Sequence, residues 1–212
     1  MSLYQELAGR IGLGESKIAP RLFEMLADET DAKILLSLPG TVQDLQMKMG
    51  LTQEEAEKRM EDLFLKGLVF PSHKTAPATY RMGRDFVQFH DATILWKDAP
   101  IEFLDLWQEF MEKEWPEYAR RISEMLPKPF TRMIPVNVSI QAKTNILDFE
   151  SVSEMVKKAR ILAVTKCTCR LTARKCDRPL EACIQVNNAA AYALSRGTGR
   201  KISAEEALDI LK

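Results

Sequence analysis

The chain has 212 residues, of which 46% are hydrophobic and 28% charged, and its formal net charge is zero, so it suits a soluble globular protein of one large or two small domains. No apolar run is long enough to span a bilayer, and the N-terminus lacks the basic and apolar regions of a signal peptide. We therefore expect a cytoplasmic protein with reduced thiols and no membrane partner.

Residues 1–83 have the apolar spacing and the turn residues of a small helical module followed by strands. The predicted elements are, in chain order, helices over residues 1–11, 20–38 with a break or bend near Asp28, 41–49 and 52–66, then a β-hairpin of residues 68–70 and 79–82. The last of these helices begins with a capping-box sequence, Thr52-Gln-Glu-Glu55.

Three helices followed by a hairpin is the order of a winged-helix domain, so we predict a winged-helix-like module over residues 1–83. Helix 52–66 would be its recognition helix, and it has five acidic residues against three basic ones. Duplex binding depends on neutralising phosphates, so DNA is a disfavoured partner. A protein-interaction or homodimerisation role fits this module better.

Residues 84–130 are rich in aromatic side chains and are expected to form a helical connector. One helix is predicted over most of residues 100–116, with Phe103, Trp107 and Phe110 at helical spacing. Such an aromatic stripe usually lies in a core. The alternative is a groove that docks a partner.

Residues 131–212 are predicted to form a small α+β domain, which makes the whole chain α+β and mostly helical. Apolar and polar residues alternate strictly around residues 132–141, which predicts a half-buried strand there. The other predicted elements are a helix over residues 151–158, a strand over 160–165, a helix from Pro179 to about Leu194, and a helix over 203–211.

All four cysteines fall within 17 consecutive residues at the spacing C-x-C-x6-C-x6-C, and they are Cys167, Cys169, Cys176 and Cys183. Disulfides among them would close only short loops, so they are not the framework of a domain this size. Basic residues interleaved with them favour thiolates. The spacing therefore predicts four ligands for one inorganic centre.

The basic excess is confined to the last quarter of the chain, where residues 160–212 have 10 Lys and Arg against 5 Asp and Glu. This charge would offset an anionic centre or steer an acidic partner. It is equally consistent with a solvated basic surface.

The predicted centre is either a [4Fe-4S] cluster or a structural zinc ion. Zinc sites usually pair their cysteines as C-x(2–4)-C, and this chain has no such pair. A larger multi-iron cluster accepts six-residue spacings more readily, so the cluster is favoured and zinc is kept as the alternative. Cys183 is expected near the start of the helix predicted from Pro179, where unpaired N–H groups favour anionic ligands.

Three motifs run from the first cysteine towards the C-terminus: Cys167-Thr-Cys169-Arg170, Cys176-Asp177-x-Pro179-Leu180-Glu181-x-Cys183, and Gly199-Arg200-x-Ile202-Ser203-x-Glu205-Glu206-Ala207-Leu208. Together they resemble the 4Fe-4S ferredoxin-type iron-sulfur proteins of anaerobic bacteria and archaea that carry a CxCR…CDxPLExC segment. In that family a winged-helix-like region commonly precedes the segment and a dicluster ferredoxin domain commonly follows it.

The resemblance implies cluster binding at the four cysteines and a part in electron transfer in an anaerobic redox system. This sequence ends at Lys212 without a ferredoxin domain. We therefore expect the redox partner to be a separate protein, or a ferredoxin domain that a truncated sequence lacks.

Motifs for substrate chemistry are missing from the sequence, which has no glycine-rich phosphate loop, no G-x-S-x-G and no H-E-x-x-H. The two histidines, His73 and His90, lie far from the cysteines and from each other in sequence. We therefore expect an electron-transfer component or subunit rather than a stand-alone enzyme. The alternatives are a redox-sensing winged-helix DNA-binding regulator and a zinc-stabilised scaffold or adaptor.

Overall fold

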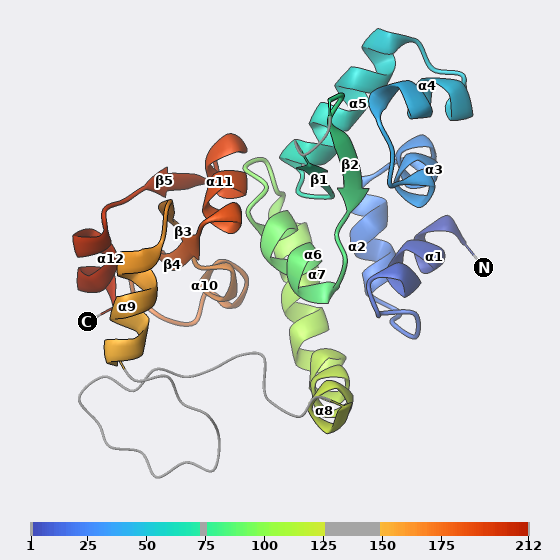
Figure 1. Cartoon of the computed structure of the whole chain (residues 1–212). Helices are drawn as coiled ribbons and strands as arrows, with labels where there is room; N and C mark the ends of the chain where they lie inside the picture. Colours follow the sequence, from blue (N-terminus) through green and yellow to red (C-terminus); the bar gives the residue numbers. More distant parts are fainter. Residues whose placement is uncertain (1, 73–75, 126–148, 212) are drawn as a thin grey trace. The chain divides into compact units, whose positions relative to one another are not determined.

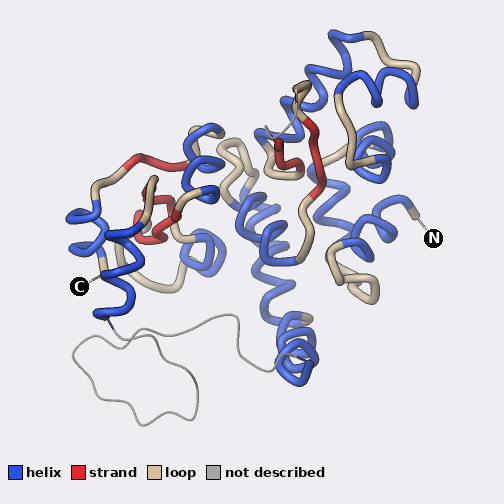
Figure 2. Tube along the Cα trace, in the orientation of Figure 1, coloured by secondary structure: helices blue, strands red, loops and turns tan. Residues whose placement is uncertain are grey.

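The computed structural model describes residues 2–72, 76–125 and 149–211, and in these ranges the protein is α+β, mostly helical, with two small antiparallel sheets (Figure 1). The chain divides into two compact units, one of Met1–Phe110 with Thr168–Lys175 and one of Met111–Cys167 with Cys176–Lys212. Both units are built from helices and short strands (Figure 2). In the described ranges, no helix has the length and apolar character that crossing a bilayer requires.

The first unit begins with three helices, α1 (Leu3–Arg10), α2 (Ala19–Leu26) and α3 (Glu29–Ser37). Pro20 lies in the first turn of α2, where its missing N–H breaks no helical hydrogen bond. A capping box separates α2 from α3, because the Asp28 side chain accepts from the Asp31 amide and the Asp31 side chain accepts from the Asp28 amide. The interruption predicted near Asp28 is therefore a complete break between two helices.

A helix pair and a hairpin follow, formed by α4 (Val42–Met49), α5 (Gln53–Leu65), β1 (Val69–Ser72) and β2 (Thr79–Met82). Thr41 and Thr52 start the two helices with capping boxes, and Gly50 ends α4 in the left-handed conformation at φ 68°. β1 pairs antiparallel with β2. Two backbone hydrogen bonds of 2.8 and 3.1 Å between Gly40 and Tyr80 tie the hairpin to the start of α4. The predicted helix pair and hairpin are confirmed.

An aromatic core occupies the remainder of the first unit, where α6 (Phe86–Ile94) and α7 (Ile101–Lys113) contribute most of the rings. Trp107 is fully buried, and its ring lies against four phenylalanine rings, those of Phe86, Phe89, Phe103 and Phe110. Phe23 of α2 stacks on Phe89 with ring centroids 4.3 Å apart. The predicted helix over residues 100–116 and the assignment of its aromatic stripe to a core are confirmed.

The second unit contains α8 (Trp115–Met125), α9 (Phe149–Lys158), β3 (Leu162–Lys166), β4 (Glu181–Val186), α11 (Asn188–Ser195), β5 (Gly199–Lys201) and α12 (Ala204–Ile210). Its sheet has the order β4-β3-β5, and both pairings are antiparallel. The central strand β3 is buried except at its last residue, Lys166, as expected for a strand paired on both edges.

The two faces of this sheet are covered by different helices. On one face Leu162 and Val164 pack in an apolar cluster with residues of α9 and α12. The other face lies against α11, and at Gly199 the contact is closer than most side chains have to their neighbours. A Cβ there would stand 3.1 Å from Cγ2 of Thr165 and 3.2 Å from Cβ of Ala193.

One predicted element is wrong, because residues 181–186 form strand β4 and not the start of a helix from Pro179. The helix α11 begins only at Asn188, after Asn187 takes a positive φ of 52°. Backbone pairing with β3 decides the conformation here, with Ile184 opposite Val164. The strand over 160–165 and the helices over 151–158 and 203–211 are confirmed within one or two residues. The strand predicted over 132–141 lies outside the described residues.

Candidate metal centre

The sheet of the second unit places two of the four cysteines at the base of one loop. Cys167 directly follows β3, and its backbone N–H donates a 2.7 Å hydrogen bond to the carbonyl of Leu180. Cys183 lies in β4 opposite Thr165, whose hydroxyl donates to the Cys183 carbonyl at 3.4 Å. Both thiols are half-buried. The residues between β3 and β4 therefore form a loop that backbone pairing closes next to Cys167 and Cys183.

Strand β4 shows that the expected position of Cys183 near the start of a helix is wrong. No helix begins near this thiol, because β4 continues to Val186 and α11 starts at Asn188. The helix N-terminus expected to favour an anionic ligand set at Cys183 is therefore replaced by a strand that pairs with β3. At Cys183, compensation of negative charge therefore does not come from the start of a helix predicted at Pro179.

Cys169 lies on a short helix, α10 (Thr168–Ala173), which belongs to the first unit. Its two threonines are buried, and within the helix the Thr172 hydroxyl donates to the carbonyl of Thr168 at 3.3 Å. Cys169 is exposed on the other side. Cys176 follows α10 in the loop and is exposed as well.

Polar contacts from α6 and α7 hold α10 within the first unit. The Thr168 hydroxyl donates to Oδ1 of Asp91 at 3.3 Å, and Arg174 at the end of α10 forms an ion pair with Asp105. Arg174 adopts a positive φ of 49°, a conformation that costs a non-glycine residue energy and so needs such fixing. The sequence did not predict these contacts, because nothing in it pairs Asp91 with a residue 77 positions away.

Asp91 also contacts the only histidine among the described residues, His90. Oδ1 of Asp91 lies 2.8 Å from Nδ1 of His90, so one carboxylate oxygen serves both the imidazole and the Thr168 hydroxyl. The His90 ring is buried against Phe86 and Trp107, with centroid distances of 5.5 and 5.0 Å. His90 is thus a core residue. The other histidine, His73, lies outside the described residues.

The four cysteines are all reduced thiols in this structure, and none is engaged in a disulfide. Among residues 2–72, 76–125 and 149–211, however, no three side chains of Cys, His, Asp or Glu come close enough together to hold a metal ion. Cys169 belongs to the first unit and the other three cysteines to the second. Cysteine thiols are suitable ligands for an iron or zinc centre. The described side chains do not, however, bring such ligands together around one ion.

The helix pair and hairpin of the first unit bear on the predicted DNA-binding alternative, because two of the three basic residues of α5 and its C-cap, Arg59 and Lys66, bond within the unit. Arg59 bonds to Asp28 and Asp31 at 3.0 and 2.7 Å. Burial acts to raise the pKa of Asp28, but the Asp31 amide and Arg59 outweigh it and leave that pKa lowered. Lys66 donates to the carbonyl of Leu26 at 2.7 Å and lies over the Trp96 ring. Lys58 alone remains exposed beside the acidic residues of α5.

In comparison with known proteins, the chain matches no family model, no curated protein and no solved structure.

Proposed function

We propose that this protein binds one [4Fe-4S] cluster through Cys167, Cys169, Cys176 and Cys183 and acts as an electron-transfer component of an anaerobic redox system. The observation that carries the proposal is the confinement of all four thiols to 17 residues around a single β3–β4 connection. The resemblance of the three motifs to 4Fe-4S ferredoxin-type proteins supports the same assignment.

A bound cluster would supply one-electron redox chemistry, with the four cysteine sulfurs as its ligands. The chain's own contribution is to hold those sulfurs and to balance their charge. Exposed basic residues in the same stretch, Lys166 and Arg178, are available to offset a negatively charged centre. Electrostatic compensation of this kind favours the more reduced, more negative state and so raises the reduction potential.

We further propose that α3, α4, α5, β1 and β2 form a winged-helix module whose partner is a protein. The order of these elements and the bridge from Gly40 to the hairpin support the winged-helix assignment. The internal use of Arg59 and Lys66 argues against duplex binding, which needs basic side chains free to reach phosphates. The redox-sensing DNA-binding regulator is therefore the weaker alternative.

Analysis of iron, acid-labile sulfide and zinc in anaerobically prepared protein tests the cluster. We expect about four iron and four sulfide per chain. One zinc ion without sulfide would overturn the cluster and leave the zinc-stabilised scaffold. Anaerobic preparation is needed because exposed clusters oxidise and the freed thiolates then take up zinc.

A further inference from the structure

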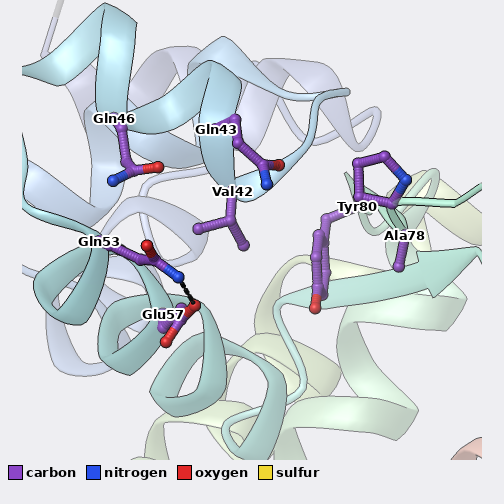
Figure 3. A pocket seen from close by; sticks show the side chains of 8 residues that line it. Val42, Gln43, Gln46, Gln53, Glu57, Ala78 and Tyr80 are labelled. Carbon is purple, nitrogen blue, oxygen red and sulfur yellow. Dashed lines mark hydrogen bonds between the residues drawn. The ribbon is translucent and has the colours of Figure 1, made fainter.

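A cleft opens in the first unit between α4, α5 and the hairpin, with a volume of about 190 Å³ (Figure 3). Its lining combines four polar side chains, one aromatic ring and three small apolar residues, and consists of Val42, Gln43, Gln46, Gln53, Glu57, Pro77, Ala78 and Tyr80. Nothing in the cluster proposal uses this cleft.

The fold brings these side chains together from three elements. Gln43 and Gln46 are three residues apart on α4 and therefore lie on the same side of that helix. Gln53 and Glu57 are four residues apart on α5, where the Gln53 amide donates a 2.8 Å hydrogen bond to Glu57 (Figure 3). The Gly40–Tyr80 bridge fixes the hairpin beside the start of α4 and so sets the position of the Tyr80 ring in the cleft.

The lining is rich in hydrogen-bond acceptors and negative in charge. Glu57 contributes a carboxylate, and the three glutamines contribute amide oxygens. None of the described residues that line the cleft is basic. Glu54 and Glu61 are exposed on α5 to either side of Glu57, and so extend the negative surface along the helix. An anionic ligand such as a phosphate would be repelled here.

We propose that this cleft binds an arginine side chain presented by a partner protein. A guanidinium offers five N–H donors in a plane, which matches one carboxylate and several amide oxygens. Its flat face stacks on aromatic rings such as that of Tyr80. The aliphatic stem of arginine packs on small apolar surfaces of the kind that Val42 and Ala78 provide. The inference rests on the proposed protein-interaction role of this module and is independent of cluster binding.

Titration of the full, isotope-labelled chain with N-acetyl-arginine amide, followed by NMR, tests the proposal. The matched probe is N-acetyl-citrulline amide, which has nearly the same shape and no charge. We expect saturable shifts of the side-chain amides of Gln43, Gln46 and Gln53 with the arginine probe and clearly weaker binding of the citrulline probe. Glu57→Gln should weaken arginine binding about two- to fivefold, the range typical of an exposed ion pair.

The control variant is Glu54→Gln, which removes the same charge from α5 outside the cleft and should weaken binding less than Glu57→Gln does. Equal binding of the two probes, or equal losses in the two variants, would refute the proposal. Displacement of the arginine probe by a short DNA duplex would also refute it, in favour of nucleic acid. Iron and sulfide contents are measured separately and should be the same in Glu57→Gln as in the unchanged protein. Failure of the cluster assignment can therefore be distinguished from failure of arginine binding.

Discussion

Thr168, the residue between the first two cysteines, donates its hydroxyl hydrogen to Asp91 on α6 at 3.3 Å. The acceptor oxygen is the one that also contacts His90, whose ring is part of the aromatic core. Cys169 on α10 is therefore positioned by a contact of its neighbour Thr168 with the core of the first unit.

Replacing Asp91 with alanine should loosen α10, because the buried Thr168 hydroxyl loses its acceptor. The loss of one such hydrogen bond costs about 1 kcal/mol. We expect faster alkylation of Cys169 and faster proteolysis near Arg170 in the metal-free protein. Asp98→Ala removes an exposed carboxylate nearby in sequence and serves as the control. Unchanged alkylation in Asp91→Ala would show that this anchor does not position α10.

Replacing Cys176 with serine should abolish the cluster while the helices of the first unit stay folded, because their apolar faces pack independently of the cysteine loop. Iron and sulfide content and the visible absorbance measure the first effect, and far-ultraviolet circular dichroism measures the second. The control is Arg178→Gln, a change in the same loop that removes no ligand. Full metal content in Cys176→Ser would mean that this thiol is not a ligand.

Glycine 199 offers a test of the sheet in the second unit. Gly199→Ala places a methyl group 3.1 Å from Thr165 and 3.2 Å from Ala193, so overpacking should lower the free energy of unfolding by about 1–3 kcal/mol. Hydrogen exchange of the β3 amides reports this loss. The same substitution at Gly9 meets no atom within 4 Å and should stabilise α1 by about 0.5–1 kcal/mol. Equal effects of the two substitutions would contradict the close contact at position 199.

Acid should weaken the link between α5 and the cap of α3. The pKa of Asp28 is lowered from 3.8 by its hydrogen bonds to the Asp31 amide and to Arg59, which outweigh the opposing effect of burial. A lowered pKa in the folded state contributes stability that is present above pH 3.8 and is lost as the pH falls below that value.

Since Asp28 is largely exposed, its ion pair with Arg59 contributes about 0.5 kcal/mol to the free energy of unfolding after solvent screening. Arg59→Gln should therefore lower the urea midpoint at pH 7 but have little effect near pH 2. Lys58→Gln, one position earlier on α5, is the control. A similar loss at both pH values would show that Arg59 acts through packing and not through its charge.

Local chemistry explains why most helices were predictable from the sequence. The capping box at Thr52 and Glu55 involves residues three positions apart, and the same holds for Asp28 and Asp31. Gly50 in a left-handed conformation ends α4 in the same local manner. Signals of this kind are complete within a few residues, so no tertiary contact is needed to interpret them.

Strand β4 shows where local signals fail. Pro179 followed by Leu, Glu, Ala and Cys is compatible with a helix start, yet Ile184 pairs with Val164, which is 20 positions earlier. The hydrogen bonds of that pairing outweigh a weak local preference. The same limit applies at the candidate site. The identity of the four thiols is evident from the sequence, but the anchoring of α10 to Asp91 and Asp105 depends on contacts 77 and 69 residues apart.

The hydrogen bond from Cys167 to Leu180 has an entropic consequence for metal uptake. Bringing the ends of a flexible loop together costs free energy that grows with the logarithm of its length, and the pairing of β3 with β4 meets this cost before any ion arrives. An incoming ion then has to order chiefly the exposed thiol of Cys176, because Cys169 already lies on the anchored helix α10. Affinity for iron or zinc should consequently fall at the denaturant concentration that separates β3 from β4, and not gradually across the range below it.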